Sequence, residues 1–291
     1  MRSLKSPRAA MILSMAMFGT LAPFVRRISV TSGELALCRA ILASVIIALF
    51  LMVTRQRIPL RRIRRELPLL LFSGMAMGFN WILLFEAYKY TTVSVATLSY
   101  YFAPVLVTAA CPFLFKEKLT ARQLLCFVMS TLGIVLITGV SGAGESGTDL
   151  IGILFGLSAA VLYAVVILLN KFIRNVEGIH RTLLQFLAAV VVLIPYVAMT
   201  SGVTLGSMDA MGWVCLLVVG LVHTGVTYCM YFSALRDLTG QKAAILSYID
   251  PLVAVLISVL VLHESMTLWQ IIGGALILGF TFLNEIAPEK H

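Results

Sequence analysis

The chain has 291 residues, of which 60% are hydrophobic and 12% are charged, and its formal net charge at pH 7 is +9. Soluble domains are about 45–50% apolar and about 25% charged, so this composition argues against a water-soluble globular protein and against a disordered one. The basic residues lie between apolar segments instead of forming a basic domain, which argues against nucleic-acid binding as the reason for the positive charge.

Ten apolar segments follow one another along the chain. A helix needs about 20 mostly apolar residues to cross a bilayer. The segments also lack the alternation of apolar and polar residues that is typical of membrane β-barrels. We therefore predict an all-α membrane protein with ten transmembrane helices, at residues 9–25, 33–54, 67–88, 91–115, 120–140, 150–170, 179–200, 210–235, 239–262 and 267–286.

Lysine and arginine occupy the connections between these segments unevenly. The N-terminus and every second connection carry them in groups, with six arginines between residues 55 and 65. The alternate connections hold only Arg26, Arg27 and Lys89. Because cytoplasmic loops are enriched in lysine and arginine, we predict a multi-pass protein of the cytoplasmic membrane with both termini in the cytoplasm. The arginine group is then a topology anchor next to the lipid bilayer and not a nucleic-acid site.

An internal repeat relates the two halves of the chain. Shifted by 147 residues, the stretch 85–123 matches the stretch 232–270 at nine identical positions without a gap. Each repeat unit, residues 1–145 and residues 146–291, then contains five predicted helices, and an odd number inverts the second copy in the membrane. Inverted repeats are common in secondary transporters, whose halves expose a central site to each side in turn. A duplicated membrane protein without transport is the alternative.

The repeated residues resemble those of EamA-like ten-helix transporters in the drug/metabolite transporter superfamily. The family pattern is an alanine near the end of one helix, a proline in the next, and a glutamate about a dozen residues later. Both halves show it, and the segment Phe18 to Thr20 departs from the family's first helix. The resemblance implies transport of a metabolite, since the family includes exporters of amino acids and other metabolites and some importers. The carrying residues are Ala87, Pro104 and Glu117, and Ala234, Pro251 and Glu264.

Two ionisable residues lie near the middle of predicted helices. Asp250 directly precedes Pro251, and His223 lies halfway along the eighth segment. Charged side chains are costly inside a bilayer, so a functional role is the first hypothesis. Both fit either of two roles: binding a substrate ammonium, or taking up a proton that couples transport. The alternatives are a local cap or pair for Asp250 and a packing role for His223.

Arg39 and Glu86 form a second candidate pair, in the outer halves of the second and third segments. Their opposite charges predict an ion pair that acts as a structural latch or gate. The other hypothesis is that Arg39 binds a substrate carboxylate, because a guanidinium matches a carboxylate with two parallel hydrogen bonds.

Aromatic and small polar residues at mid-depth favour a cavity for a small amphiphilic solute, with aromatic walls and a few polar groups. Hydrogen bonding between packed helices is the alternative for each residue taken alone. Together with the ionisable residues, the predicted substrate-binding set is Asn80, Trp81, Tyr101, Tyr163, His223, Thr227, Tyr248 and Asp250.

The predicted function is a secondary active transporter that exports a small organic metabolite, an amino acid or a related amine, by alternating access. Protons are the candidate coupling ion. The chain shows no G-x-x-x-x-G-K-[ST] loop for ATP, and its five cysteines lie within apolar runs without metal-ligand spacing, so no cofactor and no metal are predicted. The rivals are an integral membrane enzyme and a scaffold subunit, but H-E-x-x-H and G-x-S-x-G motifs are absent. Because both halves are fused, we predict a monomer.

Overall fold

The computed structural model describes residues 6–56, 63–115, 120–141, 148–173, 175–176, 178–235, 237–238, 243 and 246–286. Every regular element within these residues is a helix, so the predicted all-α class is confirmed for them. The helices are α1 Pro7–Gly19, α2 Leu21–Arg27, α3 Ser32–Val53, α5 Leu67–Tyr90, α6 Val93–Tyr100, α7 Ala103–Phe115, α8 Ala121–Ser141, α9 Thr148–Phe172, α10 Gly178–Thr200, η1 Leu205–Ser207, α11 Ala210–Leu217, η2 Val218–Val226, α12 Thr227–Leu235, α14 Ile249–Leu260 and α15 Leu268–Ile286.

Seven stretches of the described chain are long and apolar enough to cross a membrane, and they make this a multi-pass membrane protein. Three further helices are apolar but shorter: Ala121–Ile137, Ile249–Leu260 and Leu268–Asn284. The seven stretches are Pro7–Arg27, Ser32–Val53, Leu67–Tyr90, Val93–Leu114, Asp149–Phe172, Gly178–Thr200 and Ala210–Leu235.

Side-chain caps and prolines set several helix ends. The Thr31 hydroxyl accepts a hydrogen bond from the Glu34 amide at 3.2 Å and caps α3, and Asp209 caps α11 through the Gly212 amide at 2.8 Å. The predicted helix 91–115 is broken, because α6 ends at Tyr100 and α7 begins at Ala103. The Pro104 ring has no N–H to donate and clashes with a continuing helix, which explains this break.

A second irregularity lies within the stretch Ala210–Leu235, where the nine residues of η2 form a π-helix. Side chains bind the carbonyls of its wide turns. The Thr224 hydroxyl donates to the Val219 oxygen at 2.8 Å, the Thr227 hydroxyl donates to the Val222 oxygen at 2.8 Å, and His223 Nδ1 lies 3.3 Å from the Val218 oxygen. Such segments occur frequently at functional sites.

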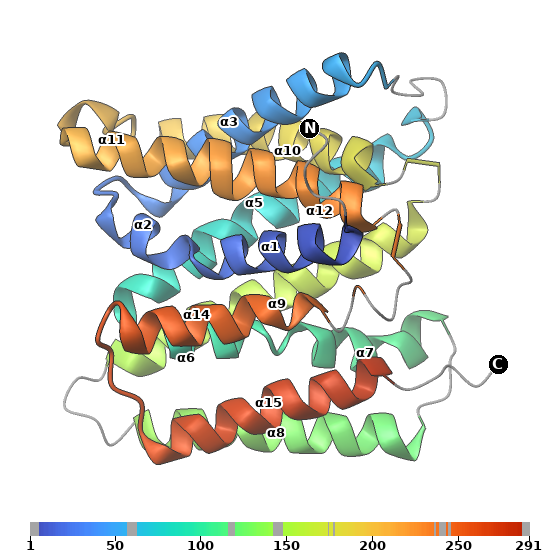
Figure 1. Ribbon diagram of the computed structural model, residues 1–291, viewed down its shortest axis with the longest axis vertical. Coiled ribbons are helices and arrows are strands. Elements are labelled where there is room, and N and C mark those ends of the chain that lie inside the picture. Colours follow the sequence, from blue (N-terminus) through green and yellow to red (C-terminus); the bar gives the residue numbers. More distant parts are fainter. Residues whose placement is uncertain are drawn as a thin grey trace.

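The helices lie roughly side by side and define two ends of the molecule (Figure 1). α1 begins and α15 ends at the right of this view, which we call the terminal end. α2 and α14 end at the left, which we call the distal end. α5 packs against α9 and α10, α3 packs against α10 and η2, and α1 packs against α12 and α14. α8 and α15 form a pair along the lower edge.

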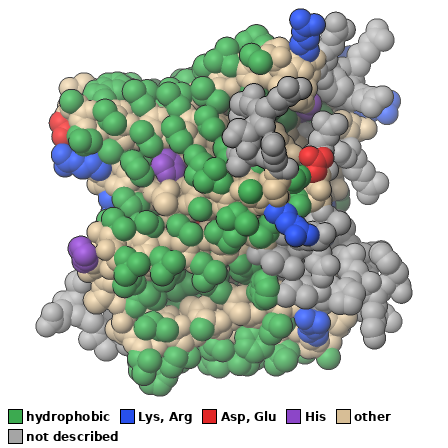
Figure 2. Space-filling view, in the orientation of Figure 1, with side chains coloured by type: hydrophobic (Ala, Val, Ile, Leu, Met, Phe, Trp, Pro, Cys, Tyr) green, Lys and Arg blue, Asp and Glu red, His purple; other side chains and the backbone are tan. Residues whose placement is uncertain are grey.

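Glycines bring α8 and α15 into backbone contact. A Cβ atom on Gly133 would lie 2.6 Å from the Gly273 carbonyl oxygen, and one on Gly273 would lie 2.5 Å from the Gly133 oxygen. Small residues at such crossings allow close helix packing in membranes. On the surface, hydrophobic side chains cover the middle of the visible face, and charged side chains lie toward its two ends (Figure 2). This distribution suits a protein surrounded by lipid.

Candidate functional site

A cavity of about 520 Å³ lies at the centre of the bundle. Its lining comes from α1, α2, α3, α5, α6, α7, α9, α10, α12 and α14, so both halves of the chain contribute. The volume lies within the range of about 300–1,000 Å³ that is typical of small-molecule sites. The cavity is therefore the candidate binding site.

Arg39 supplies a positive charge to the cavity. Its side chain, on α3, is only 4% exposed, and Nε donates a hydrogen bond to the Thr224 hydroxyl at 2.7 Å. The guanidinium carbon lies 4.4 Å from the centre of the Trp81 ring, a cation–π contact. Within the described chain, no carboxylate lies at ion-pair distance from Arg39. Neutral groups therefore hold this buried cation in place.

Asp250 supplies a negative charge from the first turn of α14. The Tyr101 hydroxyl, from the break between α6 and α7, donates to Asp250 Oδ2 at 2.6 Å. Gly19 of α1 lies so close to α14 that a Cβ atom on it would be 2.6 Å from the Asp250 carbonyl oxygen. Arg39 and Asp250 thus line one cavity without pairing with each other.

Aromatic rings form much of the wall between these charges. Tyr100 stacks on Tyr163 with the ring centres 5.2 Å apart, and it meets Tyr101 edge-on at 5.9 Å. On the other side, Phe18 and Tyr228 are in edge contact at 5.1 Å. The wall combines apolar faces with hydroxyl groups, which suits an amphiphilic ligand.

Most of the predicted binding residues come together here. Asn80, Trp81, Tyr101, Tyr163, Tyr248 and Asp250 all line the cavity. Asn80 also has a packing contact, because its Nδ2 donates to the Ala159 carbonyl at 2.6 Å and ties α5 to α9. The ring of Tyr248 lies 5.2 Å from that of Phe282 on α15.

His223 and Thr227 lie in a different place. Neither lines the cavity. His223 Nε2 is 3.1 Å from the Thr20 hydroxyl, at the break between α1 and α2, and its ring packs on Phe24 at 4.8 Å. At α-helical spacing, His223, Thr227 and Tyr231 would lie on one face of the helix. The π-helical segment η2 has more residues per turn, so only Tyr231 of the three faces the cavity.

The predicted ion pair between Arg39 and Glu86 is not formed. Glu86 Oε1 instead accepts from Lys89 Nζ at 2.8 Å, three residues later on the same helix. Neighbours at this spacing pair readily on a helix surface, whereas Arg39 is directed toward the cavity and Thr224. Arg39 and Glu86 are therefore not paired in this structure, and the latch and carboxylate hypotheses both stay predictions.

Several cavity residues are absent from the predicted set. Gln185 on α10 is buried, and its amide donates to the Ser73 hydroxyl at 2.5 Å and to the Asn170 side-chain oxygen at 2.7 Å. Polar residues within apolar segments are the signal that could have found them. Besides Gln185 they include Tyr88, Tyr100, Asn170, Arg181 and Tyr228.

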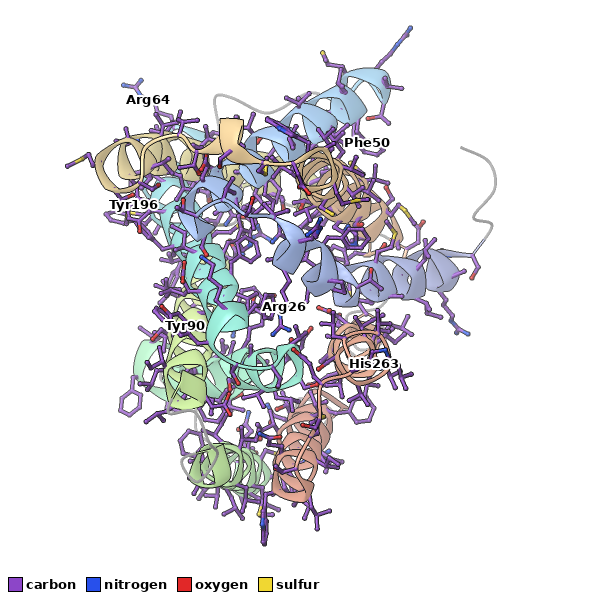
Figure 3. All side chains as sticks on the ribbon, turned by 90° about the vertical axis from the view of Figure 1, so that its left-hand side faces the viewer. Arg26, Phe50, Arg64, Tyr90, Tyr196 and His263 are labelled. Atoms are coloured by element: carbon purple, nitrogen blue, oxygen red, sulfur yellow. The ribbon has the colours of Figure 1, made fainter. Side chains whose placement is uncertain are left out.

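A polar cluster at the distal end joins three helices. We call it the distal gate, and its residues are Arg26, Thr91, Val93, Ser258 and Glu264. Glu264 forms an ion pair with Arg26 and accepts from the Ser258 hydroxyl and, at 2.9 Å, from the Val93 amide. Arg26 also donates to the Thr91 carbonyl at 2.8 Å. Viewed from this end, Arg26 extends from α2 into the space toward α6 and α14 (Figure 3).

The cavity is shielded at the distal end and continues toward the terminal end. The lining residues Leu84, Tyr88 and Thr97, in the distal half, are buried. Those near the terminal end of their helices, such as Arg181 and Ser247, are partly exposed. Glu117, the repeat partner of Glu264, lies outside the described residues. The distal part of the lining is therefore covered in this structure.

No group of three or more histidine, cysteine, aspartate or glutamate side chains in the described part of the chain could hold a metal ion. The ligand-binding groups among the described lining residues are the guanidinium groups of Arg39 and Arg181, the Asp250 carboxylate, tyrosine hydroxyls and amides. These groups bind polar and charged organic solutes by hydrogen bonds and ion pairs.

Comparisons with known proteins bear on the whole chain. Uncharacterized transporter YxxF of Bacillus subtilis (strain 168) is 30% identical over 269 residues, which cover 92% of this chain and 85% of the relative. An uncharacterized transporter of Archaeoglobus fulgidus is 29% identical, with 95% of each chain covered. A crystal structure of a protein that is 18% identical superposes with a TM-score of 0.65 over 94% of this chain and 95% of that chain, which shows the fold alone.

The sequence model of the EamA-like transporter family matches the chain twice, at residues 8–139 and 150–285. The two matches cover nearly the whole sequence and include the motifs around Pro104 and Pro251 that carry the resemblance. This multi-pass membrane protein therefore belongs to the EamA-like transporter family, within the drug/metabolite transporter superfamily.

Proposed function

We propose that the protein is a secondary active transporter that moves a small organic metabolite, an amino acid or a related amine, through the central cavity by alternating access. The observation that carries this proposal is the cavity itself, which contains Arg39 and Asp250 and is closed at the distal gate. A cavity closed on one side is the geometry that alternating access requires.

An inverted repeat of two five-helix units supports this mechanism. The family model matches each half once. In this arrangement the equivalent helices of the two halves are α9 and α1–α2, α10 and α3, and α11–α12 and α5. The contact of α5 with α9 in the structure then has its counterpart in the contact of α12 with α1. Likewise, α5 on α10 corresponds to η2 on α3. Two halves that are packed alike can exchange conformations and open the same cavity to the other side.

The ten-helix arrangement follows from the same correspondence. α14 then corresponds to α6–α7 and α15 to α8, so that the short apolar helices join the seven long ones as spans. The pairs α3 with α10, α6 with α14, and α8 with α15 each join equivalent helices, as expected next to an axis that relates the two halves. Since one chain completes the cavity, the working unit is a monomer.

Transport is directed outward in this proposal. The connections at the terminal end carry most of the lysine and arginine, which favours a cytoplasmic location for that end. The present state then faces the cytoplasm and is ready to load an intracellular solute. Asp250 is the candidate group for binding a cargo ammonium or a coupling proton, since it is the carboxylate in the cavity.

The test is efflux from liposomes that contain the purified protein and are loaded with a mixture of cellular metabolites. Mass spectrometry identifies which compounds leave faster than from protein-free liposomes, with and without a pH gradient. We expect selective loss of amino acids or amines, and faster loss with the gradient if protons are coupled. With correctly folded protein, equal loss from both kinds of liposome would overturn the proposal.

A further inference from the structure

Arg39 and Asp250 carry opposite charges in the cavity lining, and each has hydrogen-bonding groups left for a ligand. Within the described chain, the only hydrogen-bond partner of the Arg39 guanidinium is Thr224, which binds Nε. The two Nη groups therefore have donors left for a ligand. Asp250 uses Oδ2 to accept from Tyr101, so its Oδ1 remains an acceptor on the lining of the same cavity.

An isolated charge in the membrane interior is costly, and a chain usually offsets it by pairing. Arg39 is 4% exposed and has the Trp81 ring and a hydroxyl as neighbours, but no carboxylate partner among the described residues. The planar fork of a guanidinium fits a carboxylate through two parallel hydrogen bonds. The geometry thus provides a place for a ligand carboxylate next to Arg39.

Asp250 is complementary to the other end of such a ligand. A primary ammonium has three donors and no acceptor, so it requires acceptors such as a carboxylate and hydroxyl oxygens. Asp250 Oδ1 and the tyrosine hydroxyls in the lining offer these acceptors. The stacked rings of Tyr100 and Tyr163 add an apolar surface for the rest of the molecule.

Resting on the proposed transport function, we propose that Arg39 and Asp250 together select a zwitterion, whose carboxylate binds Arg39 and whose ammonium binds Asp250. The two ends of the ligand satisfy Arg39 and Asp250 at the same time, and its own net charge is zero. A monoamine or a monocarboxylate satisfies only one of the two residues and leaves the other without a partner. The pair thereby determines which charge class of solute enters.

The experiment uses ligand sets that share one side chain and differ only in charge. The aromatic set is phenylalanine, phenethylamine and 3-phenylpropionate, and the aliphatic set is leucine, isoamylamine and 4-methylpentanoate. Trp81 reports binding by its fluorescence, because it lines the cavity. Trp213 and Trp269 are exposed and are replaced by Phe, which leaves Trp81 as the sole tryptophan of the chain.

We expect the zwitterion of at least one set to bind about tenfold or more tightly than both of its single-charge analogues. Asp250→Asn should abolish the preference over the carboxylate, and Arg39→Gln should abolish the preference over the amine. The control is Arg27→Gln, which removes an exposed ion pair with Asp209 outside the cavity and should keep the wild-type preference.

Absence of a zwitterion preference in both sets would overturn the inference, and so would variants of Arg39 and Asp250 that keep the wild-type preference. Ligand binding is measured at equilibrium and does not require transport. The zwitterion proposal and the transport proposal can therefore fail independently of each other. Metabolite efflux without a zwitterion preference leaves transport standing and refutes the charge-pair assignment. A zwitterion preference without efflux of any compound refutes transport instead.

Discussion

Arg39 shows how a single residue acquires its role from its neighbours. Its position within an apolar segment marks it as unusual in the sequence. Its partners could not be predicted, because Thr224 lies 185 positions away in the chain. Thr224 is also part of a π-helix, and α-helical periodicity does not predict which of its side chains face Arg39. The register of the same π-helix explains why His223 contacts Thr20 and not the cavity. The charge of Arg39 and its depth in the membrane were predictable from the sequence, but the direction in which its side chain points was not.

Asn80 combines a cavity position with a helix-packing contact, and its packing contribution can be measured. Replacing Asn80 with Leu removes the hydrogen bond to the Ala159 carbonyl that ties α5 to α9. We expect a loss of about 0.5–2 kcal/mol in the free energy of unfolding in detergent. Thr200→Val is the control, because it removes a hydrogen bond within an exposed helix end. Equal stability of the Asn80 variant and wild type would contradict this packing role.

At the scale of elements, helix breaks and close crossings position the site. Pro104 and Pro251 lie in the first turns of α7 and α14. The sequence predicts a continuous helix over 91–115, so the break before Pro104 is known only from the structure. Tyr101 reaches Asp250 from the break before α7. The close approach of α1 to α14 at Gly19 was not predictable, since glycine is frequent in membrane helices and its spacing does not identify the facing helix.

The Gly19 crossing leads to a prediction about stability. Gly19→Ala places a Cβ atom 2.6 Å from the Asp250 carbonyl oxygen and 2.7 Å from Val253 Cβ, so α1 and α14 must move apart. We expect a loss of about 1–3 kcal/mol in the free energy of unfolding. Gly279→Ala on α15 is the matched control, because its Cβ would meet no atom within 4 Å. Indistinguishable unfolding curves for the two variants would argue against a tight crossing.

The distal gate leads to a prediction about access. Glu264→Gln removes the charge that holds Arg26 while keeping the size of the side chain. We expect the distal end to open more often, since fewer charged contacts join α2, α6 and α14. The readout is the labelling rate of Ala254→Cys, a buried lining position, by an impermeant maleimide added at the distal side of a cysteine-free protein.

We expect labelling of this cysteine to rise several-fold in the Glu264 variant. In the same background, Arg27→Gln serves as the control, because its partner Asp209 lies outside the gate. The double exchange Arg26→Glu with Glu264→Arg restores the opposite charges and should return the rate toward wild type. A labelling rate that is unaffected by Glu264→Gln would show that this cluster does not close the cavity.

At the scale of the whole molecule, composition and segment length identify an all-α membrane protein, and the repeated Pro and Glu motifs identify the family. Those features are local or periodic, which is why the sequence reveals them. The cavity depends on long-range packing of at least eight helical elements, and its full lining follows only from the three-dimensional structure.

If solute crosses the membrane through this cavity, blocking the cavity in a folded protein should stop transport. Ser247 lines the cavity near the terminal end, and its hydroxyl donates only to the Ala243 carbonyl, so Ser247→Cys is a mild change. Ser233 makes the same kind of bond, to Cys229, but lies exposed outside the cavity. Ser233→Cys is therefore the matched control.

The measurement is metabolite efflux from liposomes containing each variant in a cysteine-free background, before and after labelling with a bulky maleimide. Mass spectrometry of the protein confirms that labelling is complete. We expect the label at position 247 to abolish efflux and the label at position 233 to leave efflux unchanged. Undiminished efflux from protein that is fully labelled at position 247 would show that solute does not cross through this cavity.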